Sequence, residues 1–238
     1  MKKNLIALTL CLLSLIPCSP ATPDPKKNVP SPEMLQARLW EVSRLQDFKL
    51  EGFLRTDKNL HPIIMRTRDR EIVFEFQKQP LQIRVVMNEI GSIIQKRKAK
   101  NEAWMPVTGK ERLEKILDSD ASYEDLGMDF LRWSEVRPLG GDSIKTLEAW
   151  AYEAKPPTSS NYAKTHFWIS SDYLAVLRVD AFNEKNQIIK RVEVNGVMKV
   201  GNAYTIKEMV IASIIPGRDL SSSRTFIEIR KAEPGSGL

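Results

Sequence analysis

Apolar and polar residues alternate along most of the chain, which is the period of a half-buried β-strand. Phe48, Leu50 and Leu54, for example, fall on one face of an expected strand. The turns between such tracts are short, which favours antiparallel pairing over parallel crossovers. About eleven strands are predicted in all. The tracts that carry the pattern include residues 72–76, 83–87, 93–98, 144–154, 163–170, 173–182, 187–200, 203–215 and 224–230.

A sheet of this many sequential strands is expected to curl, because strand twist accumulates across a sheet. A strongly curled sheet with a helix across its mouth encloses a cavity. Small residues interrupt the alternation at three places. Residues 140–142 (Gly-Gly-Asp) are predicted as a turn before a strand, and residues 221–223 (Ser-Ser-Ser) as a turn. Asn195-Gly196 is interpreted as a bulge within one long strand, with a hairpin turn as the alternative.

The helical period of 3.6 residues occurs near the N-terminus and in the middle of the chain. Ser31 is a predicted N-cap and Pro32 the first residue of a helix. The apolar stripe of this helix consists of Leu35, Leu39, Val42 and Leu45. Trp40 falls outside the stripe, so it is either exposed or packed on a second surface.

A central block from Gly109 to Ser134 is also predicted to be helical, first over Lys110 to Leu117 and then over Ser122 to Ser134. In the second helix Ser122 is the expected N-cap. Tyr123, Leu126, Phe130 and Trp133 share its apolar face, and Asp125, Asp129 and Arg132 fall on the opposite side. Two interpretations remain open: the helix covers one end of the sheet, or its apolar face also contacts a ligand.

The N-terminus has the pattern of a secretory signal peptide. Lys2 and Lys3 precede an apolar run from Leu5 to Ile16, which is shorter than the roughly 20 residues of a membrane span. The predicted organisation is a signal peptide over residues 1–21, a flexible tether over 22–32, one domain over 33–232 and a disordered tail over 233–238. Lipid modification of Cys18 is the alternative, although Pro17 replaces the small residue expected before a modified cysteine.

Composition removes several classes of chemistry. Both cysteines, Cys11 and Cys18, lie in the leader, so cleavage after Ala21 leaves no thiol for disulfides, catalysis or metal binding. The formal net charge of +6 includes the two leader lysines and becomes +4 without them (6 − 2). The basic run from Lys96 to Lys100 is interpreted as a solvated strand end, with anionic lipid or an acidic partner as the alternative. Nucleic-acid binding is not expected.

No assembled catalytic or metal motif is found in the sequence. The two histidines, His61 and His166, have no second ligand at metal-binding spacing, and no G-x-S-x-G motif is present. Glu71 and Glu75 share a strand face, but acidic residues alternating with apolar ones are typical of an outer sheet face. We therefore expect neither an enzyme nor a metal or cofactor.

Aromatic residues are concentrated in the central helix and the strands after it. For each of them a place in the core is the alternative to ligand contact. Trp150 and Tyr152 share one strand face, and Trp168 follows on a later strand. The predicted apolar ligand contacts are Tyr123, Leu126, Phe130, Trp133, Trp150, Tyr152 and Trp168.

Several segments between about Asp120 and Lys231 resemble the LolA-like outer-membrane lipoprotein-sorting proteins of Gram-negative bacteria. They are SYEDL, DFLRWS, LEAWAYEAKP, HFWIS, LRVDAFN, NAYTIKEMVIA and SRTFIEI. The resemblance implies an α+β, mainly β fold: an incomplete antiparallel β-barrel whose concave face is closed by helices. It also implies an apolar cavity that holds acyl chains during passage across the periplasm.

The function implied by this resemblance is that of a monomeric periplasmic carrier. It would take acyl chains of lipoproteins or related lipids from an inner-membrane transporter and pass them to an outer-membrane acceptor. The alternatives are a lipoprotein-sensing interaction module, a receptor anchored to the outer membrane through Cys18, and an accessory lipid carrier for an exporter of the resistance-nodulation-division type.

Overall fold

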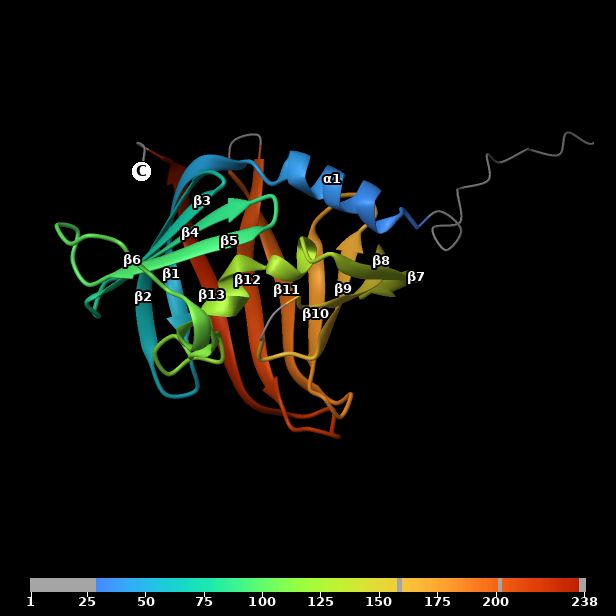
Figure 1. The fold of residues 1–238 in the computed structure, drawn as a ribbon. Coiled ribbons are helices and arrows are strands. Elements are labelled where there is room, and N and C mark those ends of the chain that lie inside the picture. Colours follow the sequence, from blue (N-terminus) through green and yellow to red (C-terminus); the bar gives the residue numbers. More distant parts are fainter. Residues whose placement is uncertain (1–28, 158–159, 201–202, 236–238) are drawn as a thin grey trace, which may run out of the picture.

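One antiparallel sheet of 13 strands forms the framework of the computed structural model, which describes residues 29–157, 160–200 and 203–235 (Figure 1). The predicted signal peptide, most of the tether and the last three residues lie outside the described residues. The strands are β1 (Leu45–Arg55), β2 (Leu60–Asp69), β3 (Glu71–Phe76), β4 (Leu81–Asn88), β5 (Gly91–Arg97), β6 (Met105–Pro106), β7 (Glu135–Ile144), β8 (Leu147–Lys155), β9 (Lys164–Ser170), β10 (Val176–Phe182), β11 (Ile188–Val200), β12 (Ala203–Ile214) and β13 (Ser221–Pro234).

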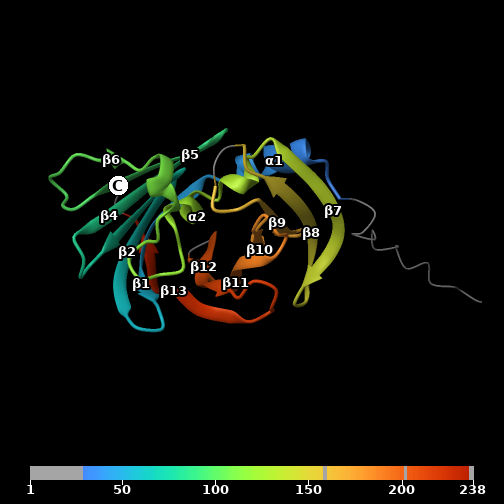
Figure 2. The same ribbon diagram turned by 60° about the horizontal axis from the view of Figure 1, so that its bottom comes forward.

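The strand order is β6-β5-β4-β3-β2-β1-β13-β12-β11-β10-β9-β8-β7, so β6 and β7 are the two edges. The sheet is curved but not closed, which confirms the predicted incomplete barrel (Figure 2). The first half of the chain builds the sheet outward from β1, and the second half returns from β7 to pair β13 with β1. The chain between β6 and β7 must therefore pass from one edge of the sheet to the other.

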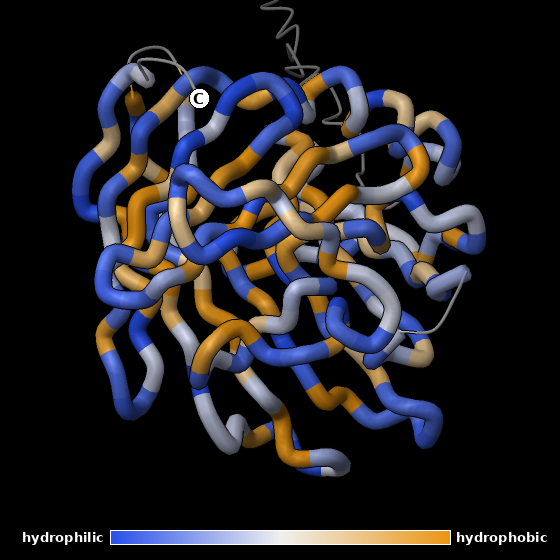
Figure 3. Tube along the Cα trace, turned by 60° about the vertical axis from the view of Figure 1, so that its left-hand side comes forward, coloured by the Kyte–Doolittle hydropathy of each residue, from blue (hydrophilic) through white to orange (hydrophobic). Residues whose placement is uncertain are grey.

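Strand alternation accounts for most of the sheet. Leu50, Leu54, Phe74 and Phe76 are buried, as their shared faces predict. Hydrophobic and hydrophilic residues alternate along the strands in Figure 3. The predicted bulge is confirmed, because β11 runs through without a turn and its register with β12 shifts on both sides of Gly196.

Two of the predicted turns are wrong. Residues 140–142 lie within β7, where the register with β8 shifts between Pro138 and Gly140 and Gly140 has φ +122°. An edge strand tolerates proline and glycine because one of its two sides makes no hydrogen bonds to another strand. These residues gave the segment the composition of a turn, so the strand was not predicted. Residues 221–223 begin β13, and Ser223 pairs with Ser213 on β12. β13 also extends through Pro234, two residues into the predicted tail.

The first helix, α1 (Pro32–Val42), forms as predicted, but its apolar stripe was predicted too long: Leu45 belongs to β1, and Val42 is 54% exposed. Ser31 Oγ accepts a hydrogen bond from the Met34 amide at 3.3 Å. Leu35 is fully buried, and the preceding Pro30 carbonyl accepts a hydrogen bond from Tyr152 Oη at 2.8 Å, so the last residues of the predicted tether pack on the sheet. Trp40 packs on a second surface, with the Arg70 guanidinium 3.9 Å from its ring centroid.

The backbones of β1 and β13 approach each other closely at Gly52. The register shifts between Glu51 and Gly52, and a Cβ placed on Gly52 would lie 2.0 Å from the Glu228 carbonyl oxygen. Only glycine fits there without separating the two strands.

Gly52→Ala is expected to lower the free energy of unfolding by about 1–3 kcal/mol, because the two halves of the sheet must move apart. The control is Gly196→Ala in the β11 bulge, whose new Cβ would meet its nearest neighbour at 3.7 Å. Urea denaturation of both variants measures the difference. Equal stability of the two variants would contradict the packing argument.

Candidate binding cavity

A cavity of about 1440 Å³ lies on the concave side of the sheet. It is larger than the roughly 300–1,000 Å³ of pockets for drug-sized ligands. Its wall is predominantly apolar, and residues from β1 to β5 and from β10 to β13 contribute to it. The wall includes Leu50, Ile72, Phe74, Val176, Val179, Val192, Val194, Ile206, Met209, Ile211, Ile227 and Ile229.

The segment between the two sheet edges, residues 107–134, covers this cavity, and we call it the lid segment. It contains the 3-10 helix η1 (Gly109–Leu113), the α-helix α2 (Tyr123–Gly127) and the 3-10 helix η2 (Asp129–Leu131). Figures 1 and 2 place it across the concave side of the sheet. The lid segment and α1 together supply the helices predicted to close the concave face.

The two long helices predicted in this segment are wrong. Residues 110–117 form only a short 3-10 turn, and the helix that starts after Ser122 ends at Gly127. The start was predicted correctly: Ser122 and Asp125 form a capping box. The helix ends because Met128 is left-handed (φ 46°, ψ 39°) and Arg132 Nη2 donates to the Gly127 carbonyl at 2.6 Å.

The break at Met128 separates the residues predicted to share one apolar face. Tyr123 and Leu126 pack with strands β1 to β5, whereas Phe130 and Trp133 pack with Tyr152 and Phe167. The predicted polar side is not solvated either. Asp125 and Arg132 each retain only 10% exposure of their side chains, and Asp129 retains 16%.

Three of the seven predicted contact residues line the cavity: Leu126, Phe130 and Trp133. Tyr123 is buried beside the cavity with Lys96 5.6 Å from its ring centroid. Trp150 and Tyr152 are buried in the cluster that α1 covers.

Trp168 lies on the outer face of the sheet, whereas its neighbour Phe167 is buried on the concave side. Its indole nitrogen donates to Asp142 Oδ2 at 2.8 Å, and the Arg178 guanidinium lies 5.1 Å from its ring centroid. This position follows from the two-residue period of β9, because Phe167 and Ile169 face inward.

Two aspartates fix the middle of the lid segment to the sheet and to the β1–β2 turn. Asp120 is buried and accepts hydrogen bonds from Ser213 Oγ at 2.6 Å and Thr225 Oγ1 at 3.1 Å. Asp118 accepts from Thr56 Oγ1 at 2.9 Å and Asn59 Nδ2 at 2.7 Å, and His61 Nε2 lies 2.6 Å from it. Burial raises the pKa of Asp118, but the hydrogen bonds from Asn59, His61 and Thr56 outweigh it and lower the pKa to about 2.

An ion pair joins α2 to the cavity floor. Lys190 Nζ on β11 lies 2.6 Å from Asp125 Oδ2, and Tyr162 Oη donates to Asp125 Oδ1. Burial raises the pKa of Tyr162 well above its usual value of 10, so the phenol stays protonated and donates. Next to this pair Glu124 accepts hydrogen bonds from Ser160 Oγ and the Asn161 amide, and burial raises its pKa.

Lys190 is not among the residues predicted from the sequence, although its place in the strand pattern indicates it. Lys190 has the same strand parity as Val192 and Val194, so alternation alone places it on the apolar face. A lysine on that face, among valines, marks a buried charge that requires a partner.

Glu71, Glu75 and His166 each have a side-chain partner on a neighbouring strand. Glu71 accepts two hydrogen bonds from Arg84, and Glu75 accepts one from Arg66 at 2.9 Å. His166 Nε2 lies 2.9 Å from Glu153 Oε2. Within residues 29–157, 160–200 and 203–235, no group of three or more histidine, cysteine, aspartate and glutamate side chains is arranged to hold a metal ion.

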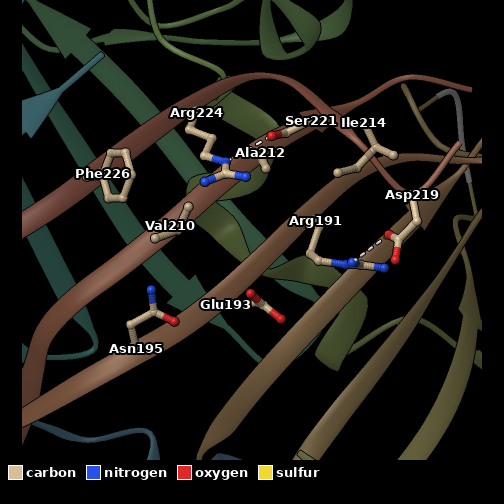
Figure 4. Close-up of a pocket in the computed structure, with 10 residues that line it drawn as sticks. All are labelled: Arg191, Glu193, Asn195, Val210, Ala212, Ile214, Asp219, Ser221, Arg224 and Phe226. Carbon is tan, nitrogen blue, oxygen red and sulfur yellow. Dashed lines mark hydrogen bonds and ion pairs between the residues drawn. The ribbon is translucent and has the colours of Figure 1, made fainter. Parts of the chain in front are cut away.

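A second, smaller hollow of about 260 Å³ lies on the outer side of β11, β12 and β13 (Figure 4). Arg191 is turned toward Asp219, with 2.9 Å between Nη1 and Oδ1, and Arg224 Nε donates to Ser221 Oγ at 2.8 Å. Its lining mixes charges of both signs with a few apolar side chains. The two faces of the same strands thus differ sharply: charged and polar side chains are frequent on the outer face, and the inner face is a predominantly apolar wall.

The fold is thus an open antiparallel half-barrel that curls around an apolar cavity, with a lid segment that joins its two edges. The model of a protein family described as "uncharacterized protein" matches residues 100–238, more than half of the chain, and the chain belongs to this family. A search of curated protein sequences gives no match.

Three solved structures share the fold. A DUF1329 family protein from Desulfovibrio piger is 17% identical, with a TM-score of 0.69 over 90% of this chain and 95% of that chain. A domain from Vibrio parahaemolyticus, named for outer-membrane lipoprotein sorting, is 13% identical. Its TM-score is 0.70 over 87% of this chain and 93% of that chain. A LolA superfamily protein from Nitrosomonas europaea is 11% identical, with a TM-score of 0.58 over 88% and 95%. At these identities the likeness is one of fold, and it confirms the predicted architecture.

Among the residues that the structure describes, no helix has the length and apolar character needed to cross a membrane.

The Asp118 contacts predict a pH-dependent anchor. Because the folded-state pKa lies below the ordinary value of 3.8, the stabilisation is present above about pH 4 and is lost as the pH falls toward 2. Asp118→Asn is expected to cost about 1–2 kcal/mol at pH 7 after allowance for solvent screening. Urea denaturation at pH 7 and at pH 2 measures both effects. A cost that is as large at pH 2 as at pH 7 would rule out the carboxylate as its source.

Proposed function

We propose that this protein is a periplasmic carrier that binds acyl chains of lipoproteins or related lipids in its cavity and carries them toward the outer membrane. The observation that supports this most directly is the apolar cavity of about 1440 Å³ under the lid segment. Burial of an acyl chain contributes about 0.8 kcal/mol per methylene, so such a wall binds a lipid tail without directional contacts.

In this proposal the protein binds and releases cargo without catalysing a reaction. A donor in the inner membrane and an acceptor in the outer membrane would be its partners, and it would act as a monomer. Three features are consistent with a carrier: the apolar wall, the segment that shields it from water, and the leader expected from the sequence.

Native mass spectrometry of the protein purified from the periplasm is the first experiment. We expect bound lipid, and saturable binding of a fluorescent fatty acid once that lipid is removed. Transfer of a labelled acyl lipid between donor and acceptor vesicles then separates a carrier from a lipoprotein sensor of the same fold, which would form a stable complex without transfer. Absence of both bound lipid and probe binding would exclude the carrier.

A matched pair of variants tests the position of the acyl chain. Val194 and Val210 are both half-buried and lie on neighbouring strands, but Val194 lines the cavity and Val210 lies on the outer face. Val194→Lys is expected to weaken fatty-acid binding at least about tenfold, because it places a charge in the apolar wall. Val210→Lys should bind like the wild type in the same fluorescence titration. Equal losses in both variants would argue against the cavity as the site.

A further inference from the structure

Charges in the cavity wall are distributed unevenly between the lid and the sheet. Five charged residues line the cavity among those that the structure describes, and four of them belong to the lid segment. They are Arg112, Glu124, Asp125 and Asp129. Lys190 is the single charged residue that the described strands contribute. On the described strands, Lys190 is therefore the one fixed charge in a wall of mostly apolar and a few uncharged polar side chains.

Lys190 is held in an environment that requires an anion. Its side chain is 13% exposed, and its strand neighbours are Ala181 on β10 and Ser213 on β12. Its ammonium group lies 5.3 Å from the Tyr162 ring centroid and 2.6 Å from Asp125. Asp125 supplies the counter-charge, and a buried ammonium left without one is strongly unfavourable.

The two members of this ion pair are not equally dependent on each other. The Asp125 carboxylate also accepts hydrogen bonds from the Ser122 amide at 2.7 Å, from Ser122 Oγ at 2.9 Å and from Tyr162 Oη. Asp125 thus keeps three donors when Lys190 leaves. Among the residues that the structure describes, Asp125 is the one carboxylate in an ion pair with Lys190, and Glu124 lies near enough to interact with Lys190 electrostatically.

We propose that Lys190 binds the anionic group of an acyl ligand, a carboxylate or a phosphate, while the acyl chain occupies the apolar cavity. The inference rests on the acyl-binding function proposed above and adds the charge of the ligand to it. The ligand anion takes the place of Asp125 beside Lys190. Binding of a ligand in the cavity therefore breaks the ion pair between α2 and β11 in the same step.

Three ligands with the same 18-carbon chain test this: oleate, oleyl phosphate and oleyl alcohol. Each competes with a fluorescent fatty-acid analogue for protein stripped of bound lipid. Lys190→Met is expected to weaken oleate and oleyl phosphate about tenfold and to leave oleyl alcohol unchanged. The control Lys199→Met removes an exposed lysine from the same strand and should change none of the three affinities.

A second variant separates charge recognition from a structural role of the ion pair. Asp125→Asn keeps an oxygen acceptor for Ser122 but removes the anion that competes for Lys190. We expect it to bind both anionic ligands several-fold more tightly than the wild type. If the pair only held the lid closed, both substitutions would shift all three ligands in the same direction, and that result would overturn the proposal.

The outcomes also distinguish the inference from the function on which it rests. If none of the three ligands binds to the wild type, the acyl-binding function fails. If all three ligands bind and Lys190→Met affects none of them selectively, the function stands and Lys190 has no recognition role. A larger loss for oleate than for oleyl phosphate identifies a fatty-acid carboxylate as the preferred ligand group, and a larger loss for oleyl phosphate identifies a phospholipid phosphate.

Discussion

The lid segment follows from one topological constraint. Because β1 pairs with β13, the two halves of the chain meet in the middle of the sheet, and the strands joined by residues 107–134 are its two edges. Those residues must cross an open, curved sheet, and the path across its concave side also shields the apolar wall from water. A cover over the cavity is therefore a consequence of strand order, and it need not be a separate element added to the sheet.

A crossing segment in this position brings backbone and charged groups into an apolar environment, where each needs a partner. The segment meets this need with many local and long-range contacts. Asp118 and Asp120 bind hydroxyl and amide donors of the sheet, Asp129 pairs with Arg112, and Asp125 caps α2 while it binds Lys190. These contacts account for the irregular structure of the segment, because their positions, and not helical propensity, decide where the chain turns.

The same reasoning explains which parts of the fold could be predicted from sequence. Strands such as β3 and β11 were predictable because the two-residue period is local, and even the bulge at Gly196 leaves a visible signal. The end of α2 could not be predicted, because it depends on a hydrogen bond from Arg132 to the Gly127 carbonyl and on the left-handed conformation of Met128. β7 was hidden because an edge strand accepts proline and glycine. Of the seven predicted contact residues, the three that line the cavity lie on the lid. Trp168 lies on the outer face because the two-residue period of β9 turns Phe167 and Ile169 inward.

An apolar wall and a fixed cation make different contributions to recognition. Burial of methylenes gives affinity that rises with chain length but discriminates poorly between lipids that differ only at one end. A buried lysine adds little net affinity, because the free-energy cost of its desolvation offsets much of the attraction in any ion pair that it forms. Its contribution is selectivity: Lys190 disfavours any ligand that displaces Asp125 without supplying a negative charge. The cost of an uncompensated ammonium, rather than the strength of any contact, is what would distinguish one acyl ligand from another in this cavity.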